Sequence, residues 1–119
     1  MNTFRKHLHS YIHACRGITI AFRFEPNMRL HFIGAIAVML INIFLQISRG
    51  EWITTGGLIA LVFMAEIFNT AIEKLSDRVT KQHDPLIRDV KDLAAGAVLI
   101  ICLFAVVCAV IIYVPYIIE

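Results

Sequence analysis

The sequence predicts an all-α membrane protein in which one N-terminal amphipathic surface helix precedes three transmembrane helices. Hydrophobic residues make up 59% of the 119 residues and charged residues only 17%, whereas a soluble domain is about 45–50% apolar. The apolar residues gather in three long stretches, and ten of the eleven Lys and Arg residues would lie on one side of a membrane that these stretches cross. Because a small soluble domain needs more polar surface than this chain can supply, the composition argues against a soluble enzyme, a disordered tail and a free nucleic-acid-binding domain.

Residues 4–24 predict an amphipathic helix that lies on the membrane surface. Their apolar side chains recur at helical spacing, while basic and histidine side chains fill the other face. The apolar positions are Phe4, Leu8, Tyr11, Ile12, Cys15, Ile18 and Phe22, and the polar positions are Arg5, Lys6, His9, His13, Arg16 and Arg23. Histidines on a surface helix are expected to be solvated rather than metal-bound. The helix should end near Glu25, because the residue before Pro26 disfavours helical backbone.

Three apolar stretches are long enough to cross a bilayer, at residues 30–47, 52–74 and 93–113. A helix of about 20 residues is about 30 Å long, which matches the hydrocarbon core of a bilayer. The third stretch carries no charge at all. The second is uncharged only as far as Glu66, so a helix that crosses there must carry polar groups at membrane depth.

The distribution of Lys and Arg predicts the orientation of these spans, since basic residues collect on the cytoplasmic side. Ten of them precede the first span or lie from the end of the second onward: Arg5, Lys6, Arg16, Arg23, Arg29, Lys74, Arg78, Lys81, Arg88 and Lys91. Only Arg49 lies between the first two spans. We therefore expect one multi-pass domain, residues 1–119, in the cell (plasma/inner) membrane. Its N-terminus and the connecting loop 75–92 should be cytoplasmic, and its C-terminus should lie outside.

A row of four polar residues, Glu66, Asn69, Glu73 and Asp77, marks the cytoplasmic end of the second span. At about 100° per residue, these four fall within about an 80° arc of one helix face. Carboxylates stacked in this way repel each other, and a carboxylate inside a membrane is costly unless it is paired or protonated. The row therefore predicts a functional site. The structural alternative is hydrogen bonding across the helices of an oligomer.

The residue types of the row suit phosphate chemistry. Carboxylate oxygens at this spacing can hold Mg²⁺, which often bridges substrate phosphates. Glu66, the deepest acid, can act as a general base, because a carboxylate shielded from water is the better proton acceptor. Lys91 can hold a phosphate as a point charge, although it fits positive-inside anchoring equally well. His31, just inside the first span, is expected to snorkel or to bond to a neighbouring helix. The sequence has no GxxxxGK[ST] loop, which excludes a P-loop nucleotide site.

These residues resemble the signature of the prokaryotic diacylglycerol kinase / undecaprenol kinase family. The matching motif reads Glu66-x-x-Asn69-Thr70-Ala71-Ile72-Glu73-x-x-x-Asp77, followed by Lys91-Asp92-x-Ala94-Ala95-Gly96. The likeness covers nearly the whole chain. It implies a small integral membrane lipid kinase that uses ATP and Mg²⁺ to phosphorylate the hydroxyl of a membrane lipid. It also implies a homotrimer whose active sites are shared between neighbouring protomers.

The resemblance also implies roles for individual residues. Glu66 is implied as the general base, and Glu25 and Glu73 as the Mg²⁺ ligands. Arg29 falls where the family has an arginine near the lipid headgroup. The other residues implied around the nucleotide are Lys6, His13, Asn69, Asp77, His83, Lys91 and Asp92. These roles fit phosphoryl transfer, which needs positioning and charge neutralisation more than covalent chemistry.

The sequence departs from the diacylglycerol branch of the family at several positions. His13 stands where a diacylglycerol-type enzyme carries a tyrosine at the nucleotide, and Pro26 directly follows the implied metal ligand Glu25. The residues that look more like the undecaprenol kinase branch are Thr70, His83 and Pro85. The substrate is therefore expected to be undecaprenol or diacylglycerol, and these residues favour undecaprenol.

The alternative function is that of a non-enzymatic small membrane oligomer, such as an ion channel or a proton-coupled transport subunit, with the row as its ion path. Such a path must cross the membrane. No charged residue lies in the outer half of any predicted span, so the row stops halfway and favours catalysis at one face. A third possibility, a structural partner of a larger complex, has no positive support in the sequence.

Overall fold

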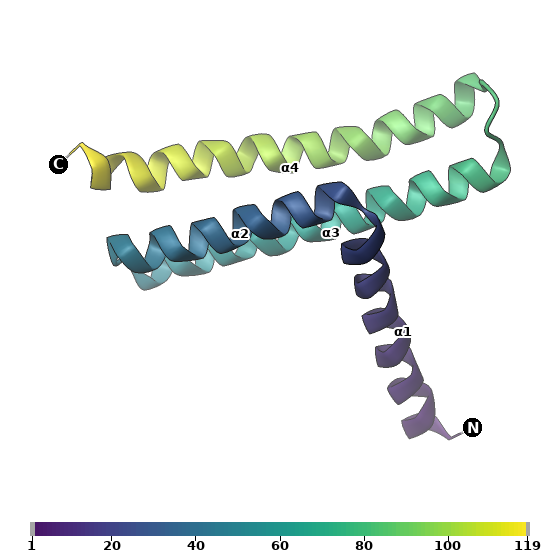
Figure 1. Ribbon diagram of the computed structural model, residues 1–119, viewed down its shortest axis with the longest axis horizontal. Coiled ribbons are helices and arrows are strands. Elements are labelled where there is room, and N and C mark those ends of the chain that lie inside the picture. Colours follow the sequence, from purple (N-terminus) through teal and green to yellow (C-terminus); the bar gives the residue numbers. More distant parts are fainter. Residues whose placement is uncertain (1, 119) are drawn as a thin grey trace.

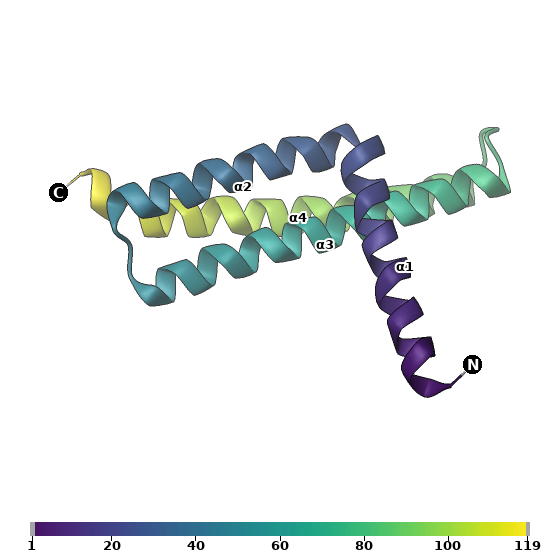
Figure 2. The ribbon, with the colours of Figure 1, turned by 60° about the horizontal axis from the view of Figure 1, so that its bottom comes forward.

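The computed structural model describes residues 2–118, which form four helices: α1 (Thr3–Phe24), α2 (Pro26–Leu45), α3 (Arg49–Val79) and α4 (Pro85–Ile117). The helices α2, α3 and α4 run side by side as a three-helix bundle, and α1 leaves this bundle at a steep angle (Figures 1 and 2). Each of the three bundle helices is long and apolar enough to cross a membrane. The all-α class is thus confirmed, together with three helices that are long and apolar enough to cross a membrane.

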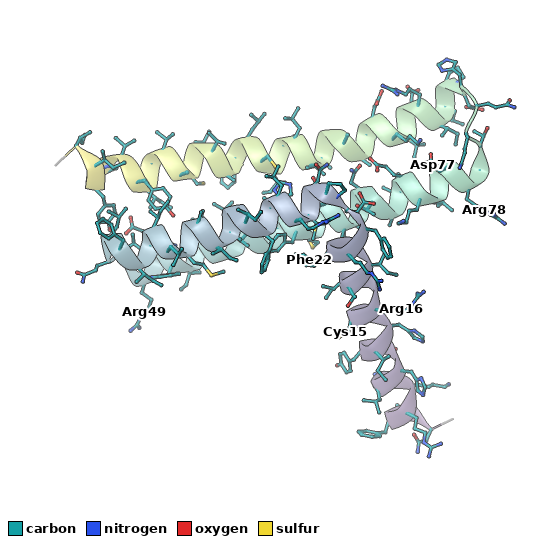
Figure 3. All side chains as sticks on the ribbon, viewed as in Figure 1. Cys15, Arg16, Phe22, Arg49, Asp77 and Arg78 are labelled. Atoms are coloured by element: carbon teal, nitrogen blue, oxygen red, sulfur yellow. The ribbon has the colours of Figure 1, made fainter. Side chains whose placement is uncertain are left out.

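The bundle has two dissimilar ends. One end carries the short α2–α3 turn at residues 46–48 and the C-terminus, and we name it the turn end. The other end carries the junction with α1 and, farther out, the α3–α4 loop at residues 80–84, and we name it the basic end. Figure 3 shows Arg49 at the turn end and both Asp77 and Arg78 toward the basic end.

The corner between α1 and α2 is a single extended residue. α1 begins where the side chain of Asn2 accepts a hydrogen bond from the backbone N–H of Arg5 at 2.8 Å, which caps the first turn. It ends at Phe24, because Glu25 is extended (φ −105°, ψ 114°) and Pro26 opens α2. Proline fits the first helical position and disfavours helical backbone in the residue before it. The predicted end of the N-terminal helix is therefore confirmed.

Phe22 attaches α1 to the bundle. Its ring packs edge-on against the rings of Phe32 on α2 and Phe63 on α3, with centroids 5.6 and 5.5 Å away, and it lies at the junction in Figure 3. Such aromatic pairs favour edge-to-face geometry. Farther along α1, exposed apolar side chains include Phe4, Leu8, Tyr11, Ile12 and Ile18. They form the face that is predicted to contact a membrane surface.

The α2–α3 turn lies earlier in the chain than the hydropathy pattern predicts, because capping residues determine where the two helices end and begin. α2 ends at Leu45, because Gln46 adopts left-handed backbone (φ 53°, ψ 52°) and its backbone N–H bonds back into the last turn. Ser48 then caps α3 in a reciprocal pair with Glu51, in which each side chain accepts a hydrogen bond from the other's backbone N–H, at 3.2 and 2.9 Å. The helix therefore starts at Arg49 rather than at the predicted residue 52.

At the basic end α3 and α4 extend well beyond the length that a membrane requires. Their 31 and 33 residues correspond to about 46 and 50 Å, against about 30 Å for a hydrocarbon core. The segment 75–92, expected as a loop, is helical except for residues 80–84. The side chain of Asp84 explains the early start of α4, because it accepts two backbone N–H bonds of the first turn at 3.0 and 3.1 Å, and Pro85 fits the position that follows.

Few side chains are buried within a single chain. The buried apolar residues among those described are Ala21, Met28, Ala35, Ile47, Leu58, Ala94 and Ile112. Most large apolar side chains of α2 and α4 are instead exposed, a surface that a protein in water rarely presents. A bilayer covers such a surface with hydrocarbon, and the helices satisfy their own backbone polar groups. The packing thus agrees with a multi-pass membrane protein.

A polar network joins the three bundle helices near the turn end. Asn42 of α2 is 1% exposed. Its side-chain amide donates to the hydroxyl of Thr55 on α3 at 3.0 Å, and its side-chain oxygen accepts from the hydroxyl of Tyr113 on α4. One turn away, the hydroxyl of Tyr116 donates to the carboxylate of Glu51. Both polar atoms of the Asn42 side chain are therefore partnered, as buried polar groups in stable structures usually are.

Candidate functional site

The row predicted from residue spacing lies on one unbroken stretch of α3, from Glu66 to Asp77. Because the helix is continuous there, the four side chains keep the common face that the spacing predicts. Glu66 is only 5% exposed, whereas Asp77 is exposed and lies near the basic end (Figure 3). One end of the row is therefore shielded and the other is open.

His31 of α2 contacts the shielded end of the row. Its Nε2 atom lies 3.2 Å from Oε1 of Glu66, and the two side chains are 26% and 7% exposed. Of the two alternatives expected for His31, snorkelling or a bond to a neighbouring helix, the structure shows the second. The sequence did not identify His31 as a site residue, because helical periodicity assigns a residue to a face but does not say which faces meet across the chain.

Asn69 and Glu73 form the middle of the row and bond to each other. The Asn69 amide donates to Oε1 of Glu73 at 3.2 Å, and Oδ1 of Asn69 is buried without a partner among the described residues. Buried polar atoms are normally paired, so this oxygen lacks a hydrogen-bond donor in the described structure. Within residues 2–118, no cluster of three or more His, Cys, Asp and Glu could hold a metal ion by itself. Any metal here must take further ligands from elsewhere, for example from a phosphate.

Asp77 connects the row to α4. The ammonium group of Lys91 donates to Oδ1 of Asp77. This hydrogen bond, aided by the charge of Lys81, holds the pKa of the Asp77 carboxyl below its usual value. Asp92 pairs with Arg88 at 3.4 Å. Exposed pairs of this kind contribute little stability, so an incoming phosphate can compete for the lysine.

The remaining predicted site residues lie on other elements. Glu25 is the corner between α1 and α2, Arg29 is in the first turn of α2, and His83 is in the α3–α4 loop. Lys6 and His13 belong to α1, the helix that leaves the bundle (Figure 1). In the described part of the chain, none of these five side chains has a hydrogen bond or an ion pair with the row. Within one chain, these five residues therefore do not contribute a hydrogen bond or an ion pair to the row.

An apolar groove of about 240 Å³ adjoins the shielded end of the row. α2, α3 and α4 all line it, and its lining includes Leu30, His31, Thr55 and Tyr113. Most of the other lining side chains are apolar. His31 both lines the groove and contacts Glu66, so this ring connects the groove to the shielded carboxylate. Largely apolar lining with a few placed polar groups is typical of small-molecule sites.

Comparison with known proteins gives a consistent set of matches. A family model described as prokaryotic diacylglycerol kinase matches residues 12–113. An undecaprenol kinase of Bacillus subtilis (strain 168) is 39% identical over 110 residues, which are 92% of this chain and 87% of that protein. A diacylglycerol kinase of Synechocystis sp. is 31% identical over 99 residues, 82% of this chain and 57% of that protein. One of Pseudomonas aeruginosa is 31% identical over 81 residues, 68% of this chain and 66% of that protein. The matched region contains all of the row, the groove and His31.

Proposed function

The chain belongs to the prokaryotic diacylglycerol kinase family and is a lipid kinase, and we propose that it transfers the γ-phosphate of ATP to the hydroxyl of undecaprenol with Glu66 as the general base. The observation that carries this proposal is the Glu66 carboxylate itself. It is shielded, it lies next to an apolar groove, and it begins a polar row that ends in the open. An alcohol on a hydrocarbon chain and a water-soluble phosphate donor can meet only at such a boundary.

The proposed transfer forms one bond to phosphorus and breaks another. The Glu66 carboxylate takes the proton of the lipid hydroxyl, and the lipid oxygen forms a bond to the γ-phosphorus. The bond from that phosphorus to the β–γ bridging oxygen breaks, and ADP leaves with its electron pair. Products are the lipid phosphate, ADP and a protonated Glu66, which then returns its proton to water. Positioned general bases contribute about 10²–10⁴-fold to such reactions.

We propose that Glu25 and Glu73 hold Mg²⁺ on the nucleotide phosphates. Mg²⁺ neutralises phosphate charge during transfer, and it uses one or two carboxylates together with phosphate oxygens. The fit rests on oxygen donors that the structure leaves available. Oδ1 of Asn69 has no partner, and Oε1 of Glu73 is bonded only by the Asn69 amide in the described structure.

The open end of the row suits the nucleotide. We propose that Lys91 exchanges its contact with Asp77 for a phosphate, and that Asp92, Asp77 and His83 complete this side of the site. Lysine holds phosphate as a point charge rather than in a fixed geometry. Arg29, in the first turn of α2, is proposed to lie near the lipid headgroup. The concentration of Lys and Arg at this end supports a cytoplasmic location, where ATP is found.

We further propose a homotrimer in which neighbouring protomers share each active site. The position of Lys6 and His13 supports this, because α1 carries both away from the row of its own chain (Figure 1). A neighbouring protomer could supply them. If so, a mixture of Glu66→Gln and Lys6→Ala chains, each inactive or weakened alone, should regain activity through sites that contain one intact copy of each residue.

Undecaprenol is proposed over diacylglycerol on two grounds. The relative named undecaprenol kinase is 39% identical to this chain. The diacylglycerol kinases of Synechocystis sp. and Pseudomonas aeruginosa are each 31% identical to it. The sequence also carries Thr70, His83 and Pro85, which look like the undecaprenol branch. Undecaprenol has no ester groups, so its recognition depends on its hydroxyl and its isoprenoid chain alone.

The test is phosphate transfer from MgATP by purified protein in mixed micelles, with undecaprenol and diacylglycerol offered separately. Glu66→Gln is the loss variant, and Glu51→Gln, the same change at the turn end, is its matched control. We expect transfer to undecaprenol that Glu66→Gln abolishes and Glu51→Gln retains. Preferred transfer to diacylglycerol would refute the substrate assignment, and full activity of Glu66→Gln would refute the general base.

A further inference from the structure

The contact between His31 and Glu66 gives the histidine a role in the reaction. We propose that His31 is a positioning residue that holds the Glu66 carboxylate through a hydrogen bond from its Nε2–H. This inference rests on the proposed function, since it assigns a further residue to the same site. It concerns the orientation of the base and not the binding of the nucleotide.

Glu66 is isolated from solvent and from polar side chains other than His31. Its side chain is 7% exposed, on a helix that is long and apolar enough to cross a membrane. A carboxylate at such depth needs a partner. His31 provides the one side-chain hydrogen bond that Glu66 has within residues 2–118, and it comes from a different helix. The bond therefore fixes the carboxylate relative to α2 as well as to α3.

The direction of the His31–Glu66 hydrogen bond depends on the histidine tautomer. We assign the hydrogen to Nε2, from which a neutral imidazole can donate to the carboxylate. The donor occupies Oε1 of Glu66 and leaves Oε2 without a partner among the described residues. A neutral donor at 3.2 Å orients the carboxylate without placing a second charge beside it. The arrangement leaves one free oxygen for the proton of an alcohol.

The imidazole ring of His31 also forms part of the groove wall. His31 lines the groove together with Leu30, Gly34 and Phe63. A lipid lying there would pass the imidazole before its hydroxyl reached Glu66. The turn-end network offers a contrast, because both polar atoms of Asn42 are partnered within the chain. Every polar atom of the Asn42 side chain thus has a partner. In the His31–Glu66 pair, Oε2 of Glu66 has none among the described residues.

The experiment compares His31→Leu, which removes the donor, with His31→Gln, whose amide can donate from a similar position. Asn42→Leu is the matched control for loss of a buried polar group on the same helix. We expect His31→Leu to lower kcat about 10- to 100-fold, since small misplacements of a reacting group cost this much, with KM for ATP within twofold. His31→Gln should retain most of kcat, and Asn42→Leu nearly all of it. Size-exclusion profiles and helicity identify any variant that fails to fold.

A second measurement needs no turnover. In protein labelled with ¹⁵N-histidine, Glu66→Leu, which removes the acceptor, should shift the Nε2 resonance of His31, assigned by its loss in His31→Gln. Wild-type kcat in His31→Leu, an equal loss in His31→Leu and His31→Gln, or an Nε2 resonance unmoved by Glu66→Leu would each overturn the inference. If wild-type protein phosphorylates neither lipid, the proposed function fails, and the resonance alone then decides whether His31 donates to Glu66.

Discussion

Two polar clusters inside the bundle share α3 but differ in kind. Near the turn end, Asn42, Thr55 and Tyr113 are neutral and bond to one another across three helices. Toward the basic end, Glu66 and Glu73 are acidic, and the neighbouring Asn69 oxygen is buried without a partner in the described structure. The first cluster is satisfied by the chain itself, and the second is only partly satisfied.

This difference separates a structural use of buried polarity from a functional one. Hydrogen bonds across membrane helices each contribute about 0.6–2 kcal/mol, and a network whose members are all paired stabilises one packing. A partly paired acidic cluster gains nothing for packing, because the unpaired groups have lost water without replacement. Such a cluster is explained when a ligand supplies the missing partners.

The region between the two clusters bears on the transport alternative. The groove that separates them is lined by apolar side chains except at His31, Thr55 and Tyr113. An ion path needs polar groups or water along its whole length. No charged side chain of the described residues bridges the distance between Glu66 and the turn end. This supports chemistry at one face of the membrane over passage across it.

The largest effect is expected at Glu66. Replacing it by Gln removes the proton acceptor while keeping the size of the side chain and an oxygen for His31, so kcat should fall about 10²–10⁴-fold. Nucleotide affinity, measured with a fluorescent ATP analogue, should stay within about twofold of wild type, since the residue lies at the shielded end of the row. If nucleotide affinity fell as much as kcat, Glu66 would be a nucleotide-binding residue rather than the base. The two ends of the row would then not differ in function.

The second effect is expected at Glu73. Glu73→Gln removes one anionic oxygen from the proposed metal site, so the Mg²⁺ concentration for half-maximal activity should rise about tenfold, the equivalent of about 1.4 kcal/mol. The measurement is a Mg²⁺ titration of transfer at fixed ATP. Glu51→Gln, at the turn end, serves as the control and should leave the curve unchanged. An unchanged curve in Glu73→Gln as well would exclude it as a metal ligand.

The third prediction addresses the satisfied cluster. Asn42→Leu removes the partner of both Thr55 and Tyr113, which should lower the free energy of unfolding by about 1–3 kcal/mol. Transfer per folded molecule should stay close to wild type, because Asn42 does not line the groove. Thermal and detergent-induced unfolding, followed by circular dichroism, measure the first quantity. If Asn42→Leu is instead stable and inactive, the turn-end network is part of the active site.

Helical periodicity predicts which residues share a helix face, and this sets the limit of what the sequence alone could predict here. The face shared by the row follows from helical spacing and is reproduced, because one unbroken helix carries all four residues. Helix ends were placed less well, since hydropathy marks the apolar part of a helix while caps such as Ser48 and Asp84 determine where it begins. The His31–Glu66 contact joins residues 35 positions apart, and the pairing of two helix faces has no signal in a single sequence.

The smallest effect is expected at the open end of the row, where Asp77 lies on the last turn of α3, beyond the predicted span 52–74. The hydrogen bond from Lys91 lowers the pKa of the Asp77 carboxyl. A group whose pKa is depressed by folding stabilises the fold above its unfolded pKa, about 3.9 for Asp, and this contribution is lost as the pH falls through the lowered folded value. The change in stability should be small and should shrink in salt, because the pair is exposed.

A carboxyl ¹³C titration of Asp77 in micelles measures this pKa directly. In wild-type protein the midpoint should lie below that of a free Asp, and in Lys91→Met it should return toward the free value. The matched change Arg88→Met, which breaks the neighbouring pair with Asp92, should leave the Asp77 midpoint nearly unchanged. A non-hydrolysable ATP analogue with Mg²⁺ should raise the midpoint in wild-type protein, because a phosphate that takes Lys91 removes the donor. A midpoint insensitive to the nucleotide would mean that Lys91 stays with Asp77, and the open end of the row would then be as self-contained as the network at the turn end.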